Sequence, residues 1–393
     1  IRLGGQDISD EDLQSFTERV LKASDEMVAE GLDSPTEFEV VTAIAFLYFK
    51  EKGADITVLE VGLGGSGDST NVVNKPLACA ITSISFDHMD RLGNTLAEIA
   101  VNKAGIIKEG VPVISNVPER EAAKVIAKAA YEKNSKLYDI SKNKFMILYE
   151  TPFSQKVSMD IYGTDYSDVE ISMTGKHQGE NLKTALTIIE VLRKERKIKV
   201  ERSKLYEGLK KAVQPGRFEV LAEDPMVIID GAHNDDGARG LTAAMTRFCL
   251  NPETVPGGQP AKILMGTGIL ADKDVDAVLG HFTEITKDFV LTEPDNPRKM
   301  AAAEAAKHIE TQGGRALVVE SDIEAAVKAA MDCDLCRIRP LRTGCSFRSS
   351  SSRHLRRQNC RSCQDNTLFH PLRCMPDVWR PVCPRCFVRN PSK

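Results

Sequence analysis

Strand-like and helix-like segments alternate along the first third of the chain. Apolar residues spaced three and four apart predict helices over 10–31, 35–52, 95–107 and 119–133. Short apolar runs, several rich in β-branched residues, predict strands over 56–61, 79–84 and 111–115. Strands that alternate with helices favour an α/β fold built on a doubly wound, mainly parallel sheet.

The pattern changes at Leu137 and again at Pro215-Gly216. Short strand-like pieces fill 137–173 and predict a β-rich insertion, after which helical periodicity returns over 177–194 and 203–213. Beyond Pro215, strands and helices alternate again, which predicts a second, Rossmann-like α/β domain. Its expected elements are 226–230, 234–248, 262–267, 272–281, 289–291, 301–309, 316–319 and 323–330. We therefore expect domains over 1–214 and 215–332.

The overall charge of −4 conceals two regions of opposite sign. Residues 333–393 contain twelve Arg and one Lys against three Asp and no Glu, a net charge of +10, so 1–332 carries −14. Eight of the ten cysteines lie in this tail, which leaves Cys79 and Cys249 in the body. Two isolated cysteines form no disulfide framework, so the body is expected to be reduced and cytoplasmic. No run of 18 apolar residues occurs, so we expect no membrane span.

The tail over 333–393 allows three interpretations. Its bias toward Arg, Cys, Ser and Pro indicates a disordered or out-of-frame segment, and the composition favours this interpretation. A zinc module is the second, because the tail holds three CxxC pairs, although two further cysteines are left over. The pairs are Cys333/Cys336, Cys360/Cys363 and Cys383/Cys386. An Arg-rich nucleic-acid-binding tail is the third. We expect neither bound zinc nor a nucleic acid partner.

The segment 56–71, ITVLEVGLGGSGDSTN, carries the first sign of chemistry. The predicted strand ends on Glu60 and leads into a loop with four glycines. Ligands of open parallel sheets lie at the carboxyl ends of the strands, and glycines let the main chain approach them closely. A carboxylate at this place could hold Mg²⁺ against phosphate oxygens, although a flexible turn explains the glycines equally well.

Seven segments together resemble the folylpolyglutamate synthase/dihydrofolate synthase family of Mur-type amide ligases. They are LEVGLGGSGDSTNV at 59–72, SFDHMDRLGNTLAEIAVNKAGIIK at 85–108, TGKHQGEN at 174–181, PGRFEV at 215–220, IIDGAHNDDGA at 228–238, GILADKD at 268–274 and LTEPDNPR at 291–298. The resemblance covers roughly 1–332 and implies a Mur-ligase-like ATPase domain followed by a ligase domain. It further implies ATP and Mg²⁺ as cofactors and amide formation through an acyl phosphate.

The resemblance also implies roles for individual residues of the first domain. Glu60 and His88 match metal ligands, and His88 and Lys103 match catalytic residues, Lys103 being the lysine that the family carbamoylates. A carbamate would turn this cation into an oxygen ligand suited to Mg²⁺. The substrate side of the site would be ordered by Gly64, Gly65 and Asp68. The alternatives are a surface histidine, a solvated helix lysine and a turn-forming aspartate.

Four further residues match nucleotide contacts of the family, namely Asn181, Arg217, Asp230 and His233. The planar guanidinium of Arg217 suits phosphate oxygens. Asn181 could equally be a helix-surface residue. Turn chemistry before a helix, with Asn234 as its cap, would also explain Asp230 and His233.

Two departures from the family pattern limit the expectation. The chain contains no glycine-rich loop ending in Gly-Lys-Ser/Thr, and its start resembles the segment that follows such a loop. As written, the chain is therefore expected to hydrolyse ATP poorly. The second departure is the tail, where the family would continue into a final strand.

The resulting expectation is a monomeric ligase that adds L-glutamate to a folate or to dihydropteroate, without membrane or nucleic acid partners. The sequence does not separate dihydrofolate synthase from polyglutamate synthase activity. A cell-wall Mur ligase and a non-catalytic nucleotide-binding fragment are the alternatives, the latter because the phosphate-binding loop is missing from these residues.

Overall fold

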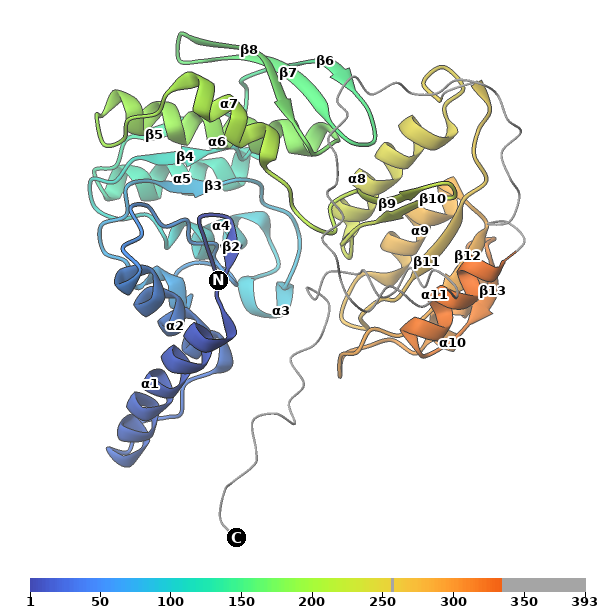
Figure 1. Cartoon of the computed structure of the whole chain (residues 1–393), viewed down its shortest axis with the longest axis horizontal. Helices are drawn as coiled ribbons and strands as arrows, with labels where there is room; N and C mark the ends of the chain where they lie inside the picture. Colours follow the sequence, from blue (N-terminus) through green and yellow to red (C-terminus); the bar gives the residue numbers. More distant parts are fainter. Residues whose placement is uncertain (256–257, 334–393) are drawn as a thin grey trace, which may run out of the picture. The chain divides into compact units, whose positions relative to one another are not determined.

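The structure, a computed structural model, describes residues 1–255 and 258–333 and divides into two units (Figure 1). The first unit is Ile1–Ala232, and the second begins at His233. The sequence placed a domain boundary near Pro215, and that boundary stays a prediction. The two units divide further along the chain, after the hairpin of β9 (Glu219–Glu223) and β10 (Met226–Ile229). This hairpin belongs to the first unit.

A short hairpin and two helices open the first unit. They are β1 (Arg2–Leu3), β2 (Gln6–Asp7), α1 (Asp10–Ala29) and α2 (Glu37–Glu51). Ser9 caps α1 by accepting a hydrogen bond from the Asp12 amide, and Thr36 and Glu39 form a capping box at the start of α2. Phe16 and Tyr48 meet edge-on in the core between the two helices, with ring centroids 5.8 Å apart.

A three-stranded parallel sheet forms the centre of the first unit. Its order is β3 (Cys79–Ile81), β4 (Val113–Ser115) and β5 (Leu137–Asp139), with Cys79 opposite Val113 and Val113 opposite Leu137. The connecting helical segments are η1 (Ser69–Val72), α3 (Met89–Leu92), α4 (Leu96–Ala104) and α5 (Arg120–Glu132). Ile99, Val113 and Ile126 are fully buried between helices and sheet. The expected α/β fold with parallel sheets is confirmed.

The strand expected over Ile56–Val61 is wrong. The segment has no regular structure, and Ile56 and Val58 are 55% and 92% exposed. β-Branched residues favour extended backbone, but a strand also needs a neighbour that accepts and donates ladder hydrogen bonds. Within the described residues, no strand pairs with this segment.

The β-rich insertion is confirmed as an antiparallel sheet of three strands. These are β6 (Met146–Glu150), β7 (Gln155–Ile161) and β8 (Thr164–Ile171). Helix α6 (Lys176–Lys194) contacts both this sheet and β4, and α7 (Arg202–Lys211) packs against β8 (Figure 1). Because α6 has sheets on two sides, it buries residues over most of its circumference.

The second unit repeats the parallel α/β pattern with the elements that the sequence predicts, except that the strand expected over 226–230 belongs to the hairpin of the first unit. The sheet order is β11 (Leu264–Thr267), β12 (Asp288–Leu291) and β13 (Arg315–Val319). The helices are α8 (Asp235–Met245), a π-helical turn η2 (Thr246–Leu250), α9 (Val275–Ile285), α10 (Ala302–Thr311) and α11 (Ile323–Asp332). Phe289, Leu279 and Ile309 are fully buried in the unit's own core.

The expectations for the tail lie outside the described residues, apart from Cys333 at its first position. Within 1–255 and 258–333, no helix combines the length and the apolar character that crossing a membrane requires.

Candidate active site

A cavity of about 190 Å³ lies at the carboxyl end of β3 in the first unit. His88 and Lys103 both line it, together with Gly64 of the glycine loop. The structure thus brings together three residues that the sequence singled out from two separate segments, 59–72 and 85–108. The other lining residues are Val61, Gly62, Leu63, Ser83, Ser85, Asp87, Leu92 and Ile99.

His88 is held in an unusual backbone conformation at the rim of this cavity. It precedes α3 with φ of 50°, in the left-handed region that residues other than glycine seldom adopt. The Asp87 carboxylate accepts a hydrogen bond of 2.9 Å from the His88 amide and lies 3.9 Å from Nε2 of the same ring. A strained position that persists next to a cavity is a common property of functional sites.

The position of Lys103 is fixed by close backbone contact between α4 and the glycine loop. The Ser66 amide donates a hydrogen bond of 3.0 Å to the carbonyl of Asn102. A Cβ at Gly65 would lie 2.7 Å from that carbonyl oxygen, and a Cβ at Gly105 would lie 2.5 Å from Cα of Ser66. Only glycine therefore permits this approach at both positions. Among the described residues, none pairs with the half-buried ammonium of Lys103.

Asp68 and Asn71 tie the glycine loop together. The Asp68 carboxylate accepts hydrogen bonds from the Leu63 and Thr70 amides, each 2.9 Å long, and from the Thr70 hydroxyl at 2.6 Å. Burial raises the pKa of Asp68, but these hydrogen bonds outweigh it and the pKa lies below its ordinary value. The Asn71 amide donates to the carbonyls of Ser66 and Gly105. Both residues order the loop, as a turn-forming pair does.

Glu60 lies apart from the cavity lining. The side chain is exposed, and the lining begins at the next residue, Val61. Its role as a metal ligand stays a prediction. Within the described residues, no group of three or more His, Cys, Asp or Glu side chains converges as a metal site would require. The carboxylate that does line the cavity is Asp87, which the sequence analysis quoted within a motif but did not select.

Arg217 and Asp230 lie together in a second cluster of the first unit. Asp230 accepts hydrogen bonds from the amides of Phe218 and Ala232, 2.7 and 2.8 Å long. The amide of Gly231 donates to the carbonyl of Gly216 at 2.7 Å, and a Cβ at Gly231 would lie 3.0 Å from the Arg217 guanidinium. The carboxylate of Asp230 thus closes the turn that carries Arg217.

His177, which was not among the residues selected from the sequence, joins this cluster from α6. Burial of its ring lowers the pKa of His177; the charge of Asp230 opposes this shift, whereas that of Arg217 adds to it. Asn181 follows four residues later and therefore lies on the same face of α6. The amide of Asn181 donates to Gln178 at 3.2 Å. A histidine in the quoted segment TGKHQGEN, one turn before Asn181, was the available signal.

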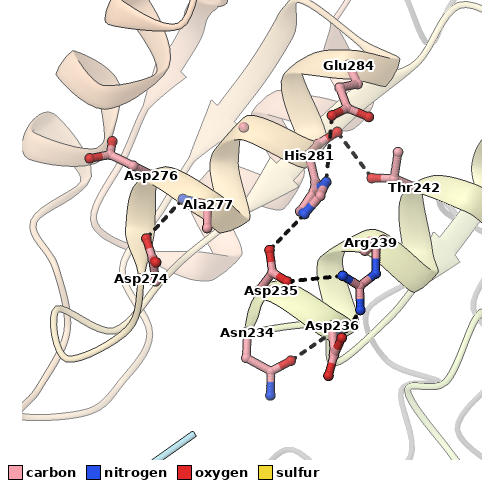
Figure 2. A network of polar contacts seen from close by, with 12 residues as sticks. Asn234, Asp235, Asp236, Arg239, Thr242, Asp274, Asp276, Ala277, His281 and Glu284 are labelled. Atoms are coloured by element: carbon pink, nitrogen blue, oxygen red, sulfur yellow. Dashed lines mark hydrogen bonds and ion pairs between the residues drawn. The ribbon is translucent and has the colours of Figure 1, made fainter. Parts of the chain in front are cut away.

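His233 and Asn234 open the second unit at the start of α8. Asn234 caps the helix by accepting a hydrogen bond of 2.9 Å from the Gly237 amide, as its residue type predicts. Figure 2 shows that the first turn is also tied to α9, because Asp235 contacts Nε2 of His281 at 2.9 Å. Glu284 lies 3.7 Å from the other nitrogen of that ring, and Arg239 pairs with Asp235 and Asp236.

Comparisons with known proteins agree with this architecture. The Mur ligase middle domain matches 15–189, and the glutamate ligase domain of Mur ligases matches 216–336. The dihydrofolate synthase/folylpolyglutamate synthase of Bacillus subtilis is 40% identical over 254 residues, which are 64% of this chain and 59% of that protein. The crystal structure of folylpolyglutamate synthase from Thermotoga maritima superposes with a TM-score of 0.70 at 33% identity, covering 84% of this chain and 73% of that one.

A third relative was solved with ligands. The Escherichia coli FolC structure in complex with DHPP and ADP has a TM-score of 0.70 at 26% identity, covering 84% of this chain and 72% of that one. Fold and matches together define the class, a Mur-type ligase. More narrowly, the chain belongs to the folylpolyglutamate synthase/dihydrofolate synthase family. It spans about three fifths of the length of the curated relatives from Bacillus subtilis and Lacticaseibacillus casei, at 59% and 60%.

Proposed function

We propose that the protein is an ATP- and Mg²⁺-dependent ligase that attaches L-glutamate to a folate, to dihydropteroate or to both. The observation that carries the proposal is the single cavity shared by His88, Lys103 and the glycine loop. The relatives support the substrate class, because one of them was solved with DHPP and ADP. A cell-wall Mur ligase is the weaker alternative, since the relatives named above are folate enzymes.

The cavity suits a magnesium ion that is shared with phosphate oxygens. Asp87 offers a carboxylate, and Ser83 and Ser85 come from the same loop after β3. Mg²⁺ commonly binds through one or two carboxylates plus waters and phosphates rather than in a full protein cage. When bound, it would neutralise charge on the transferring phosphoryl group. Lys103 fits the metal only as a carbamate, whereas its free ammonium would serve a phosphate oxygen directly.

The protein groups around this cavity would position the reactants. Gly62 and Gly64 of the loop line it and carry no side chains, so anionic oxygens can approach their main chain closely. We assign Arg217, Asp230, Asn181 and His233 to the nucleotide, as the family match implies, and retain Glu60 as a candidate metal ligand. Positioning and charge neutralisation are what phosphoryl transfer requires from a protein.

Lys103→Ala tests the proposal. Incorporation of radiolabelled glutamate into tetrahydrofolate or dihydropteroate is measured with ATP and Mg²⁺, in a protein that carries an in-frame phosphate-binding loop before Ile1. We expect a loss of activity of roughly a hundredfold or more, because one charged group would be removed from the transition state. Lys128→Gln, on the exposed face of α5, is the control. Full activity of Lys103→Ala would contradict the assignment, and competition between the two acceptors would separate the two synthase activities.

A non-catalytic nucleotide-binding fragment is the second candidate. It is favoured by one observation, the absence of a Gly-Lys-Ser/Thr loop from all 393 residues. Titration with ADP and an assay for phosphate release test this candidate. Both are carried out on this chain and on the protein that carries the phosphate-binding loop before Ile1. Binding of ADP without ATP turnover in both proteins would establish the alternative. We further propose that the protein is cytoplasmic, since Cys79 and Cys249 are buried free thiols, and that it is a monomer. Light scattering after gel filtration would measure the mass.

A further inference from the structure

A second cavity of the first unit lies away from the residues assigned to catalysis. It has a volume of about 210 Å³ and is enclosed by β8, α6, the 195–201 segment and the start of α7. We call it the α6–α7 cavity. Its lining residues are Thr164, Tyr166, Ile189, Glu190, Arg193, Val200, Arg202 and Leu205.

The carboxylate in this cavity is already fully paired. Glu190 is 2% exposed and accepts hydrogen bonds from the Tyr166 hydroxyl at 2.5 Å and the Thr164 hydroxyl at 2.9 Å. Nε and Nη2 of Arg193 donate to its two oxygens at 2.9 and 2.8 Å. Four donors satisfy the acceptor capacity of a carboxylate. The pair therefore fixes the Arg193 guanidinium in place while leaving its Nη1 without a partner among the described residues.

Arg202 is held equally firmly by two aromatic rings. Its guanidinium carbon lies 5.6 Å from the centroid of Tyr166 and 5.4 Å from that of Tyr206, whose rings are stacked 6.5 Å apart. Nη2 donates to the Asp165 carbonyl at 2.5 Å and to the Tyr206 hydroxyl at 3.0 Å. Arg202 forms no ion pair with a carboxylate of the described residues, although the charge of Asp165 helps to raise its pKa. A guanidinium group that is already held in one orientation loses little conformational entropy when it binds a ligand.

The charge around the cavity favours an anion. Two guanidinium groups face one carboxylate, which leaves a net charge of +1 on the lining. The adjoining segment 193–204 contains seven Arg or Lys residues and two Glu residues. The rest of the wall is apolar, with Ile189, Val200 and Leu205. The volume lies below the range of about 300–1,000 Å³ common for drug-sized ligands, so the ligand should be small.

We propose that the α6–α7 cavity binds a small organic anion, a carboxylate or a phosphate ester, whose charged group contacts Arg193 and Arg202. The apolar part of the ligand contacts Val200 and Leu205. This site goes beyond the ligase reaction and shares no residue with the cavity that contains Lys103.

Ligand-observed NMR and calorimetry of the full chain at low salt test the proposal, with three probes of one shape. We expect benzoate or phenyl phosphate to bind, and neutral benzyl alcohol to bind at least about tenfold more weakly, because hydrogen bonds from a guanidinium to an anion are stronger than those to a neutral hydroxyl. A preference for benzoate identifies a carboxylate site, and a preference for phenyl phosphate identifies a phosphate-ester site.

Three variants localise the binding. Arg202→Gln should weaken the anion by about tenfold or more, and Val200→Phe, which fills the cavity without a change of charge, should abolish binding. Lys204→Gln is the matched control, because it removes one positive charge from the same helix outside the cavity. Equal weakening by Arg202→Gln and Lys204→Gln, unchanged binding to Val200→Phe, or equal binding of all three probes would overturn the proposal. Ligase activity, measured in the protein that carries the in-frame phosphate-binding loop, should be unchanged in every variant, which keeps this test separate from that of the proposed function.

Discussion

At the scale of single residues, two deeply buried charges, Lys183 and Glu190, are compensated, whereas the reactive candidate Lys103 is not. Lys183 is 1% exposed and donates to Glu180 at 2.6 Å and to the Asn143 carbonyl at 3.0 Å. Glu190 is paired in the same thorough way. Lys103 is half-buried beside a cavity, yet no described residue pairs with it. An ammonium left without a protein partner is available to a ligand such as a phosphate oxygen, and the neutral amine that forms when it loses a proton is available to carbamoylation.

The pairing of Glu190 predicts a loss of stability in acid. Burial raises its pKa, but the hydrogen bonds from Arg193, Tyr166 and Thr164 outweigh this and lower the pKa from 4.5 to about 2. Because the pKa of Glu190 is lower in the folded than in the unfolded protein, its contribution to stability is fully present at pH values above the unfolded-state pKa. This contribution is lost as the pH falls toward 2. Linkage gives a contribution of about 3 kcal/mol, lost progressively between about pH 5 and pH 2. The Glu190→Gln variant should unfold at a lower temperature at pH 7. Its unfolding temperature should also depend less steeply on pH between about pH 5 and pH 2.

Thermal unfolding followed by circular dichroism from pH 7 to pH 3 measures this effect. Glu132→Gln, at an exposed ion pair of α5, is the control and should keep the slope of the unsubstituted protein. The same slope in Glu190→Gln and the unsubstituted protein would show that other carboxylates dominate acid unfolding.

At the scale of elements, the site depends on the contact between the glycine loop and the end of α4. Hydrogen bonds from Ser66 to Asn102 and from Asn71 to Gly105 join the two segments. Lys108 adds a third link, since Nζ donates to the Asn71 carbonyl at 3.0 Å. The loop has no regular structure of its own beyond η1, so these contacts determine where its amides lie relative to Lys103.

Gly105→Ala should disturb this contact more than a typical helix substitution. The new Cβ would lie 2.5 Å from both Cα and Cβ of Ser66, so the backbone of the loop must shift. We expect a loss of about 1–3 kcal/mol in the free energy of unfolding and a larger loss of ligase activity. Gly208→Ala on α7 is the matched control, because open space surrounds that position and alanine should stabilise the helix by up to about 1 kcal/mol. Normal activity of Gly105→Ala would show that the loop tolerates displacement.

Elements that carry their own periodicity could be predicted from the sequence, whereas elements that depend on a neighbour could not. The face of α6 is evident in the spacing of its apolar residues, and the structure confirms this helix to within one residue of its expected start. Ile56–Val61 has the composition of a buried strand, but pairing decides strands, and composition does not report it. The same limit applies to the site: motifs indicated His88 and Lys103, while the placement of Asp87 and His177 required the folded backbone.

At the scale of the whole molecule, the chain contains two units with separate cores. The sequence predicted two α/β domains from a change of pattern at Pro215-Gly216, whereas the units divide between Ala232 and His233. Residues 216–232 close on themselves, because β9 pairs with β10 and Asp230 accepts a hydrogen bond from the Phe218 amide, and the charges of Arg217 and Asp230 act on His177 of α6 in the first unit. Pro215-Gly216 marks a turn in the sequence, but contacts made in the folded chain decide which unit the following hairpin joins.

Separate cores predict two unfolding transitions in calorimetry, because each unit can lose its own packing cooperatively. Phe289 and Ile126 are both fully buried, one in the second unit and one in the first. Replacement of a large core side chain by alanine typically costs about 2–5 kcal/mol. Phe289→Ala should therefore lower the midpoint of one transition by several degrees, and Ile126→Ala should lower that of the other. The two variants are controls for each other, since each leaves the other core intact. A single transition that both substitutions lower equally would show that the two units unfold as one.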